Sequence, residues 1–389
     1  MAVVGAGIGG LAAAFALLRG GADVTVYEQA PALGEAGVGM HLGPNGARIL
    51  RRWGLEARLR RTAVRPEALE VRDGLDGRVH ARRPMGDTWE EEYGAPHLTV
   101  ERTDLHTALA ARIPRERIVL GARLVSFDAH GDGVRLRCAD GRTADADLLV
   151  GADGVHSVVR RAVAGEERPA FAGLSAVRGM VSAAALPRLS PDTVYVWVGR
   201  EARLLCYPVA AGRRFTFVAV MPEASARPES WEAAGERDVL VRGFAGWHED
   251  VRAVVGAAGA TGCWTLYDRE PLTRWGEGRF TLLGDAAHPM LPHHGQGVGQ
   301  ALEDAVALAH FLDKGPRGLR RYAAFRIPHV TRVQLGSRGG GSMRLSTAAA
   351  PRKPAAGGLA RLVEDVSWIH RYDIEAALTA QTYSVRSMA

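Results

Sequence analysis

The chain has 389 residues, more than one simple hydrophobic core needs, so we expect two domains or one large domain with an insertion. Its composition, 47% hydrophobic and 24% charged, is that of an ordinary globular protein and excludes a disordered or fibrous chain. No apolar run is long enough to cross a membrane, and the net charge of +6 lacks the basic clusters with interleaved aromatics that nucleic-acid binding requires.

Three widely spaced cysteines, Cys138, Cys206 and Cys263, form no CxxC motif. This pattern indicates reduced thiols rather than a disulfide framework or a zinc site. The N-terminus is a glycine-rich motif, with neither the basic segment nor the cleavage site of a signal peptide. We therefore expect a cytoplasmic protein.

Residues 1–28 read as strand, glycine turn, helix and strand, and close at Glu28. In this context the sequence GAGIGG at 5–10 is a dinucleotide-binding fingerprint. Gly5 permits the tight turn, Gly7 admits a pyrophosphate and Gly10 lets the helix pack closely on the strand. Glu28 lies 18 residues beyond Gly10, about where an acid accepts hydrogen bonds from a ribose.

Residues 34–46 are glycine-rich and precede a predicted helix at 47–53. One interpretation is an ordinary surface loop. The other is a segment that lies against a flat cofactor, since glycines allow close backbone approach. His41 is in the middle of this segment.

Residues 67–94 read as strands joined by turns at 73–74 and 76–77, followed by a polar stretch. A strand at 98–102 leads to Asp104, the expected N-cap of a helix at 105–112. Short strands follow at 118–120, 124–127, 134–138 and 146–150, and the last of them ends in the sequence GADG at 151–154.

From about residue 166 to 270 strand-like runs dominate, which predicts an antiparallel substrate layer with helices at 238–244 and 251–257. Residues 279–312 then form a strand that ends at Asp285, a loop rich in proline and glycine, and an amphipathic helix. A helix N-terminus beside a carboxylate suits a polar, partly anionic ligand. A loose segment at 336–358 and a helical region at 359–382, with Trp368, Ile369 and Tyr372 as packing anchors, complete the chain.

Three motifs together carry a family resemblance: GAGIGG at 5–10, GADGVHSVVR at 151–160 and GDAAHPMLPHHGQG at 284–297. In order and spacing they resemble the fingerprints of the p-hydroxybenzoate hydroxylase-like flavoprotein monooxygenases (class A). Finer features at 37–45, 91–106 and 367–373 are similar to the 6-hydroxynicotinate 3-monooxygenase and salicylate hydroxylase branch. The resemblance implies an α/β fold: a Rossmann-like FAD-binding domain, an inserted, mainly antiparallel substrate domain and a C-terminal helical region.

On this basis we expect an FAD-binding domain in three parts (1–66, 97–165 and 271–335), a substrate domain in two parts (67–96 and 166–270), and a linker with helices at 336–389. The resemblance also implies which residues contact FAD. The expected cofactor-binding residues are Gly5, Gly7, Gly10, Glu28, Gln29, His41, Arg102, Leu124, Asp153, Asp285, Gly297 and Val298.

The implied reaction uses NADH or NADPH as a transient reductant and O2 as co-substrate. It hydroxylates a small hydroxylated aromatic or N-heteroaromatic acid through a flavin hydroperoxide. The hydroxylation proceeds with or without decarboxylation. The protein supplies orientation, a dry pocket and a proton acceptor. The candidates for proton transfer are His41, His293 and Tyr207. The expected substrate contacts are Arg203, Tyr207, Pro289 and His293. Arg203 stands where the 6-hydroxynicotinate enzyme has a histidine. An arginine at this position could pair with a substrate carboxylate.

Three alternatives remain open at this point. The same flavin chemistry could hydroxylate or epoxidise a natural-product intermediate without decarboxylation. An oxidase would release stoichiometric peroxide. A non-catalytic flavin-binding redox sensor would show no substrate-stimulated NAD(P)H oxidation.

The loop at 288–294 lacks the helical spacing and the acidic companions of a metal site, so no metal is expected. Partners other than the small substrate are not expected, and the protein is predicted to be a monomer or homodimer.

Overall fold

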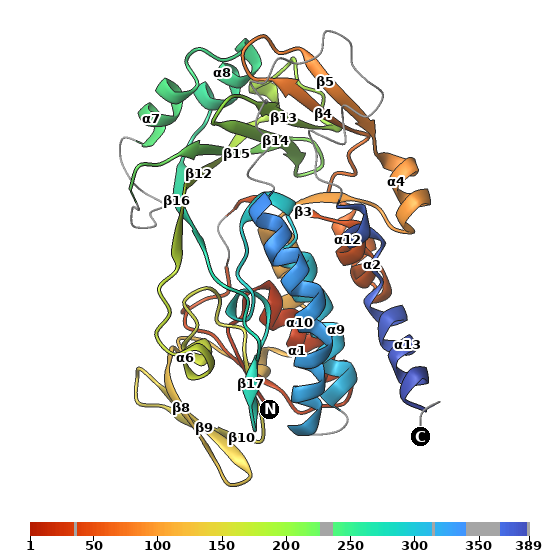
Figure 1. The fold of residues 1–389 in the computed structure, drawn as a ribbon, viewed down its shortest axis with the longest axis vertical. Helices are drawn as coiled ribbons and strands as arrows, with labels where there is room; N and C mark the ends of the chain where they lie inside the picture. Colours follow the sequence, from red (N-terminus) through yellow and green to blue (C-terminus); the bar gives the residue numbers. More distant parts are fainter. Residues whose placement is uncertain (35–36, 226–235, 313–315, 340–365, 387–389) are drawn as a thin grey trace.

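The computed structural model describes residues 1–34, 37–225, 236–312, 316–339 and 366–386. A six-stranded sheet forms the centre of the lower half in Figure 1, in the order β17-β18-β11-β1-β2-β7. All of its strands are parallel except β17, which pairs antiparallel with β18. The strands are β1 (Ala2–Val4), β2 (Thr25–Tyr27), β7 (Ile118–Val119), β11 (Leu149–Gly151), β17 (Gly276–Glu277) and β18 (Phe280–Leu282).

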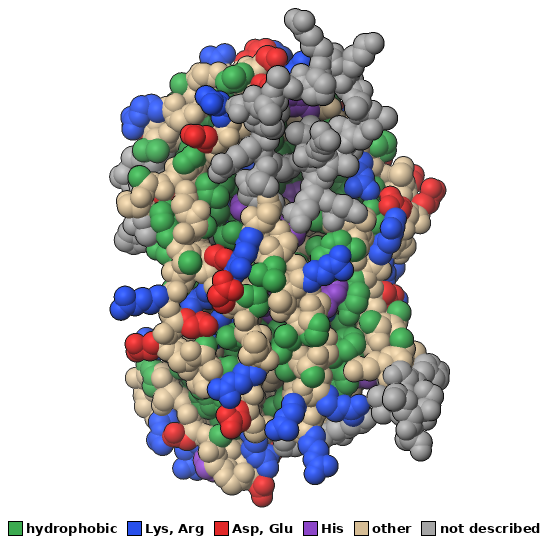
Figure 2. Space-filling view, viewed as in Figure 1, with side chains coloured by type: hydrophobic (Ala, Val, Ile, Leu, Met, Phe, Trp, Pro, Cys, Tyr) green, Lys and Arg blue, Asp and Glu red, His purple; other side chains and the backbone are tan. Residues whose placement is uncertain are grey.

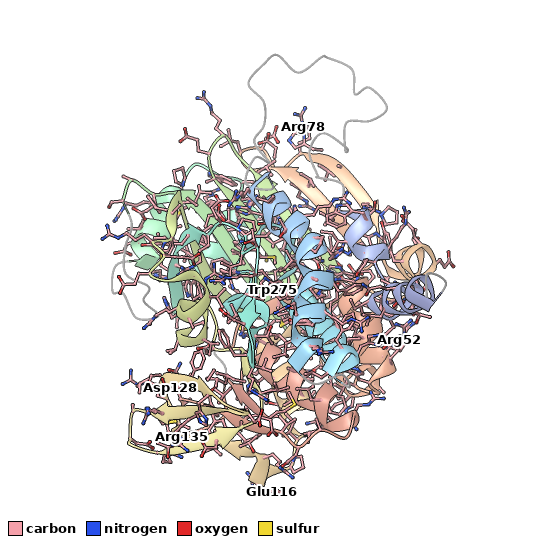
Figure 3. The ribbon with its side chains drawn as sticks, turned by 60° about the horizontal axis from the view of Figure 1, so that its bottom comes forward. Arg52, Arg78, Glu116, Asp128, Arg135 and Trp275 are labelled. Atoms are coloured by element: carbon pink, nitrogen blue, oxygen red, sulfur yellow. The ribbon has the colours of Figure 1, made fainter. Side chains whose placement is uncertain are left out.

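Two helices of small residues lie against each other beside this sheet: α1 (Ile8–Arg19) and α9 (Gly297–Phe311). Their approach is close because glycine and alanine line the contact. A Cβ at Gly9 would lie 3.4 Å from the Cβ of Ala301. Helix α10 (Pro316–Gly339) packs on α9, and Trp275, near the centre of Figure 3, is buried between the strands and these helices.

A seven-stranded sheet lies in the upper half, in the order β16-β12-β15-β14-β13-β4-β5. Every pairing in it is antiparallel except that of β13 with β4. The strands are β4 (Ala68–Asp73), β5 (Val79–Pro84), β12 (Ala170–Ser182), β13 (Thr193–Val198), β14 (Arg203–Val209), β15 (Arg214–Pro222) and β16 (Thr261–Asp268). Strands from 68–84 and from 170–268 thus meet in one sheet.

Alternation along these strands separates the two faces of the sheet. One face packs Leu204, Cys206 and Phe217 against α7 (Glu236–Gly243) and α8 (Glu249–Gly256). The opposite face presents Tyr207 and Leu205 from β14. This opposite face is the one turned toward the parallel sheet, as Figure 1 shows.

The fold class expected from the sequence is confirmed, with four local corrections. Residues 39–42 form strand β3 (Gly39–Leu42), paired with β6 (Leu98–Glu101), and are not a loop. The polar stretch before Pro96 is helix α4 (Gly86–Tyr93). Residue 101, not Asp104, is the N-cap of α5 (Arg102–Ala110). The single strand expected at 146–150 is divided between β10 (Thr143–Ala146) and β11.

A small sheet of β8 (Leu124–His130), β9 (Gly133–Cys138) and β10 extends from the parallel sheet, with Asp128 and Arg135 on its exposed surface in Figure 3. On the face drawn in Figure 2, basic side chains are interspersed with acidic ones rather than gathered. In the described parts of the chain, no helix is both long and apolar enough to cross a membrane.

The C-terminal helices α12 (Ser367–Arg371) and α13 (Ile374–Arg386) follow α10. Helix α10 runs past residue 335, where the sequence suggested a change of domain, and includes residues 336–339, so the loose segment expected from residue 336 is wrong over those residues. The rest of that expected segment, 340–358, lies outside the described residues. Arg52 of α2 (Pro44–Arg52), labelled in Figure 3, holds the Asp373 carboxylate through two hydrogen bonds of 2.7 and 2.6 Å. The division into domains stays a prediction.

Candidate functional site

The three sequence motifs meet at the carboxyl edge of the parallel sheet. Gly5 follows β1, Glu28 follows β2, Asp153 follows β11 and Asp285 follows β18. These four strands are adjacent and parallel, so their ends lie at the same edge. Ligands of open α/β sheets bind at this edge.

The glycine turn after β1 is shaped to admit a ligand at one position only. Gly5 has φ +99°, and a Cβ there would lie 2.4 Å from the carbonyl oxygen of Ala152. A Cβ at Gly10 would lie 1.9 Å from the carbonyl oxygen of Gly5, whereas a Cβ at Gly7 would meet no atom within 4 Å. Gly7 is also the N-cap of α1, with no side-chain cap. The open space at Gly7 and the free helix N-terminus fit a pyrophosphate.

Glu28 is held beside this turn by backbone groups. Its carboxylate accepts hydrogen bonds from the amides of Ala6, at 2.6 Å, and Ala30, at 2.8 Å. Gln29 beside it is exposed, and Leu124, at the start of β8, is buried. Arg102 begins α5, and its amide donates to the carbonyl of Val38 at 2.8 Å. The backbone of Arg102 is thus joined to the residue directly before β3.

Asp153 has a structural contact that the sequence did not indicate. Its carboxylate accepts from the Ser157 hydroxyl at 2.5 Å and from the Val158 amide at 2.7 Å, so it caps α6 (Val158–Ala164). Burial raises its pKa despite these bonds. Its backbone lies next to the glycine turn, because a Cβ on Gly5 would approach its Cα to 3.1 Å.

Asp285 differs, because its side chain is exposed and it makes no hydrogen bond or ion pair with any of the described residues. A Cβ on Gly297, the first residue of α9, would lie 3.8 Å from its Oδ1. Helix α9 has no acid in its first turn and no side-chain cap, and Val298 there is partly exposed. A free carboxylate and an uncapped helix N-terminus side by side fit a ligand that carries both hydroxyls and negative charge.

A buried polar network fixes α9 from behind. The Asp304 carboxylate accepts from His288 at 2.6 Å and from Arg326 at 2.8 Å, and Arg326 also contacts Glu303 at 2.8 Å. Burial alone would raise the pKa of Asp304, but these two partners outweigh it and hold the pKa at about 2. Asn45 of α2 donates to Glu303 at 2.7 Å. The network ties α2, α9 and α10 into one support for the site.

Comparison with known proteins decides what this edge binds. Residues 1–334 match the family described as FAD binding domain. The chain is 43% identical over 344 residues to a 3-amino-4-hydroxybenzoate 2-monooxygenase of Streptomyces platensis, covering 87% of this chain and 86% of the relative. It is 38% identical over 345 residues to the 6-hydroxynicotinate 3-monooxygenase of Bordetella bronchiseptica, covering 87% and 88%.

The chain belongs to the FAD-dependent class A aromatic hydroxylases.

Solved structures agree with this assignment. Klebsiella pneumoniae HpxO in complex with FAD and uric acid superposes with a TM-score of 0.82 at 29% identity, covering 97% of this chain and 95% of that one. A salicylate hydroxylase substrate complex gives 0.80 at 28% identity, covering 97% and 96%. FAD, expected from the sequence, is confirmed as the cofactor of this aromatic hydroxylase, and the non-catalytic redox sensor is set aside.

The glycine turn yields a prediction for the aromatic hydroxylase that can be tested without knowing its substrate. Gly7→Ala should leave the thermal stability of the FAD-free protein unchanged, because the new Cβ meets open space, while FAD binding weakens about tenfold or more through loss of close approach. Gly10→Ala is the matched control, since its Cβ would clash with backbone and lower stability itself. Fluorescence titration of FAD and melting curves check both. Unchanged FAD affinity in Gly7→Ala would contradict the assigned cradle.

Two residues expected to serve the substrate, Tyr207 and His41, meet where the seven-stranded sheet faces the parallel sheet. Tyr207 of β14 is buried there among Val194, Leu205 and Met180. Its ring contacts that of His41, with centroids 4.0 Å apart. Burial raises the pKa of Tyr207, so it stays a neutral phenol at pH 7. The structure thus brings two of the three proton-transfer candidates together.

His41 has a partner that sequence reasoning missed. Its Nδ1 lies 3.0 Å from Nε2 of His97, which immediately precedes β6. Burial lowers the pKa of His41 to about 4, and burial with His41 and His370 nearby lowers the pKa of His97 well below its usual value. Both imidazoles are therefore neutral at pH 7. The missed signal was a titratable residue directly before a buried strand.

The third candidate, His293, contacts Arg203. A guanidinium can only donate, so Nη2 of Arg203 donates to Nδ1 of His293, and this places the imidazole proton on Nε2. That Nε2 is buried and has no hydrogen-bond partner among the described residues. Burial, with Arg203 and His294 nearby, lowers the pKa of His293 to about 3. Pro289 is buried, and its carbonyl accepts from Gln334 of α10 at 3.0 Å.

A second cation on this face was also missed. Arg178 of β12 lies over the ring of Trp264, 5.3 Å from its centroid, and its Nε is buried without a hydrogen-bond partner in the described structure. Burial lowers its pKa, and its charge interacts with Tyr207 and Arg102. No local pattern marks such a residue, because its surroundings come from other strands.

Within the described segments, no group of three or more His, Cys, Asp or Glu side chains could hold a metal.

Proposed function

We propose that this hydroxylase acts on a small hydroxylated aromatic or N-heteroaromatic acid, with NADH or NADPH as reductant and O2 as the source of the inserted oxygen. The observation that carries the proposal is the sheet face around Tyr207. Apolar side chains of Leu205, Met180 and Val194 gather there beside a neutral histidine, and two partly buried cations, Arg178 and Arg203, lie on the same sheet. A flat apolar ring with a hydroxyl and a carboxylate matches such a surface.

The cofactor end of the proposal rests on the parallel-sheet edge. Gly7 and the N-terminus of α1 would receive the pyrophosphate, Glu28 and Gln29 the adenosine ribose, and Asp285 the ribityl hydroxyls. The N-terminus of α9, at Gly297 and Val298, would face the flavin ring, where its positive end favours the anionic reduced form. When bound, FAD supplies electron transfer from NAD(P)H and activation of O2. The chain holds it, orients the substrate and excludes water.

Proton removal from the substrate hydroxyl is assigned to His41. His97 occupies its Nδ1, which leaves Nε2 for the substrate. His293 is unsuited, because its Nδ1 already accepts from Arg203 and its Nε2 carries the proton; we assign it as a hydrogen-bond donor. Tyr207 stays protonated and packs on His41. Loss of the hydroxyl proton raises the electron density of the ring, which favours attack on an electrophilic oxygen.

The carboxylate of the substrate is assigned to Arg203. Burial lowers the pKa of Arg203 to about 10, which still leaves it charged at pH 7, and a carboxylate would restore favourable surroundings for that charge. The charge of Arg178 interacts with that of Arg102, an expected FAD contact, so we assign Arg178 to the cofactor side of the pocket. The relatives act on 3-amino-4-hydroxybenzoate and 6-hydroxynicotinate, both aromatic acids by name. A benzoate or pyridine carboxylate that bears a hydroxyl is therefore the proposed substrate class.

The proposal is tested with purified, FAD-loaded protein and a panel of hydroxylated aromatic acids. We expect substrate-stimulated NAD(P)H oxidation and a product that carries one oxygen atom from ¹⁸O2. Product mass separates simple hydroxylation from decarboxylative hydroxylation, since the latter also loses CO2. Stoichiometric peroxide with no labelled product for every acid would identify an oxidase and contradict the proposal.

A variant tests the carboxylate assignment. Arg203→Met should raise the KM for an aromatic acid about 10- to 150-fold, the equivalent of a lost charge-assisted hydrogen bond of ~1.5–3 kcal/mol. The KM for the corresponding phenol without a carboxylate should change little, because it never engaged Arg203. Steady-state kinetics with the two compounds check this. Equal KM increases for both would show that Arg203 shapes the pocket rather than binding the carboxylate.

Two finer inferences complete the proposal. Three buried cysteines that form no disulfide, together with the use of NAD(P)H, suit a cytoplasmic enzyme. The small aromatic substrate is its proposed partner, with the protein acting as a monomer or homodimer, which light scattering would determine.

A further inference from the structure

The histidine pair formed by His41 and His97 joins residues that are 56 positions apart in the chain. His41 lies on β3 and His97 immediately precedes β6, the two strands of one antiparallel pair, so the backbone fixes their separation. Three further elements contribute rings around the pair. Tyr207 of β14 packs on His41, and Trp89 of α4 meets the ring of His97 edge-on, with centroids 5.3 Å apart. His370 of α12 approaches His97 to 6.3 Å between centroids.

The hydrogen bond within the pair admits two proton arrangements. Neither imidazole is charged at pH 7, so one nitrogen of the close pair donates and the other accepts. If His41 is to accept a proton at Nε2, its own hydrogen must be on Nδ1 and must be donated to Nε2 of His97. His97 then carries its hydrogen on Nδ1, which is buried and has no hydrogen-bond partner in the described structure. The other arrangement would give Nε2 of His41 a hydrogen and disable it as an acceptor.

We propose that His97 is a positioning residue for hydroxylation that acts through His41, by selecting the tautomer in which Nε2 of His41 is the proton acceptor. This inference rests on the proposed function and deepens it. In the step concerned, the O–H bond of the substrate hydroxyl breaks and its electron pair stays on oxygen. The proton bonds to Nε2 of His41, while the Nδ1–H of His41 remains donated to Nε2 of His97. The neutral acceptor at His97 stabilises the imidazolium as it forms.

Among the described residues, no carboxylate forms a hydrogen bond or ion pair with either imidazole of the pair. The groups that face the pair are Tyr207 beside His41, and His370 and Trp89 beside His97. The charges that shift the pKa of His97 are those of His41 and His370, and no carboxylate contributes. The guanidinium of Arg83 lies over the ring of Trp89, 4.8 Å from its centroid. In the proposed tautomer, the imidazole of His97 accepts from Nδ1–H of His41 without adding a negative charge beside it.

The first test needs no turnover. Long-range ¹⁵N–¹H spectra of FAD-loaded protein report the tautomer of each histidine ring, and the His41 signal is identified by its absence from His41→Ala. We expect His41 as the Nδ1–H tautomer in the wild type and a loss of that preference in His97→Leu. An Nε2–H tautomer in the wild type would overturn the proposal. This measurement decides it even if no aromatic acid is hydroxylated, an outcome that would defeat the proposed function alone.

The second test uses kinetics with a rescue. His97→Leu should lower the rate of hydroxylation about 10- to 100-fold, as loss of a supporting hydrogen bond does elsewhere, and leave flavin reduction and KM nearly unchanged. His97→Gln, whose amide oxygen can accept from Nδ1–H, should recover most of the rate. Trp89→Phe keeps the ring packing and is the control, with the wild-type rate expected. Equal losses in His97→Leu and His97→Gln, or a parallel loss of FAD binding, would show a packing role only and overturn the proposal.

Discussion

His41→Ala should retain FAD but lose about 100- to 10,000-fold in the rate of hydroxylation, the range that a positioned general base contributes. Flavin reduction should slow far less, because it does not require the substrate hydroxyl to lose its proton. Single-turnover absorbance measurements separate the two steps. The loss should appear as uncoupling, in which NAD(P)H is consumed and peroxide is released in place of the hydroxylated product.

The pKa of His41 also predicts how the rate of hydroxylation changes with pH. His41 accepts a proton only when it is neutral, and its pKa of about 4 keeps it neutral at pH 7. Hydroxylation should therefore persist with falling pH until about 4 is approached, well below the pKa near 6.5 of an ordinary histidine. His310→Ala, at an exposed position on α9, is the matched control and should behave as the wild type. Equal slowing of reduction and hydroxylation in His41→Ala would instead indicate that His41 positions the cofactor.

Asp285→Ala should weaken FAD binding about 10- to 150-fold, because the ribityl hydroxyls lose a charged acceptor worth ~1.5–3 kcal/mol. The stability of the FAD-free protein should be unaffected, since the carboxylate is exposed and has no partner among the described residues. Equilibrium dialysis of FAD and melting curves without FAD measure the two quantities.

Asp285→Asn refines the test, because it keeps an acceptor oxygen but removes the charge. We expect an affinity between those of the wild type and Asp285→Ala. By contrast, Asp304→Asn should lower the stability of the FAD-free protein, since Asp304 is fully buried and paired with Arg326 and His288. Wild-type FAD affinity in Asp285→Ala would remove Asp285 from the cofactor site.

The cofactor edge was the predictable part of this protein, and the reason is local. Each motif combines a short apolar strand with the residues directly after it, so the chain order alone brings Gly7 and Asp285 to one edge once the strands are parallel. Even here a local pattern was incomplete. Asp153 follows its strand as expected, yet it is occupied by the N-terminus of α6 through Ser157, four residues on.

The substrate side could not be predicted as fully, because its contacts are long-range. The environment of Arg178 depends on Tyr207 and Trp264, which come from other strands of the sheet. The proposed role of His97 depends on its contact with His41, which is 56 positions away in the chain and therefore leaves no local pattern. Helix α4 was missed because most of its residues are polar, although the spacing of Trp89 and Tyr93, four residues apart on one helix face, was a usable signal.

The side chains of β14 alternate between the two faces of the sheet, and this limits which mutations can alter substrate specificity. Leu205 and Tyr207 lie on the face proposed to bind the substrate, while Leu204 and Cys206 pack beneath α7 and α8. The glycine turn and Asp285, the proposed contacts of FAD, follow strands of the other sheet. Point substitutions at the outward positions can therefore reshape the substrate surface while the enzyme keeps its flavin. A single-residue insertion within β14, by contrast, exchanges the two faces and destroys pocket and core together, so evolution toward new aromatic substrates must proceed here by replacement rather than by changes in length.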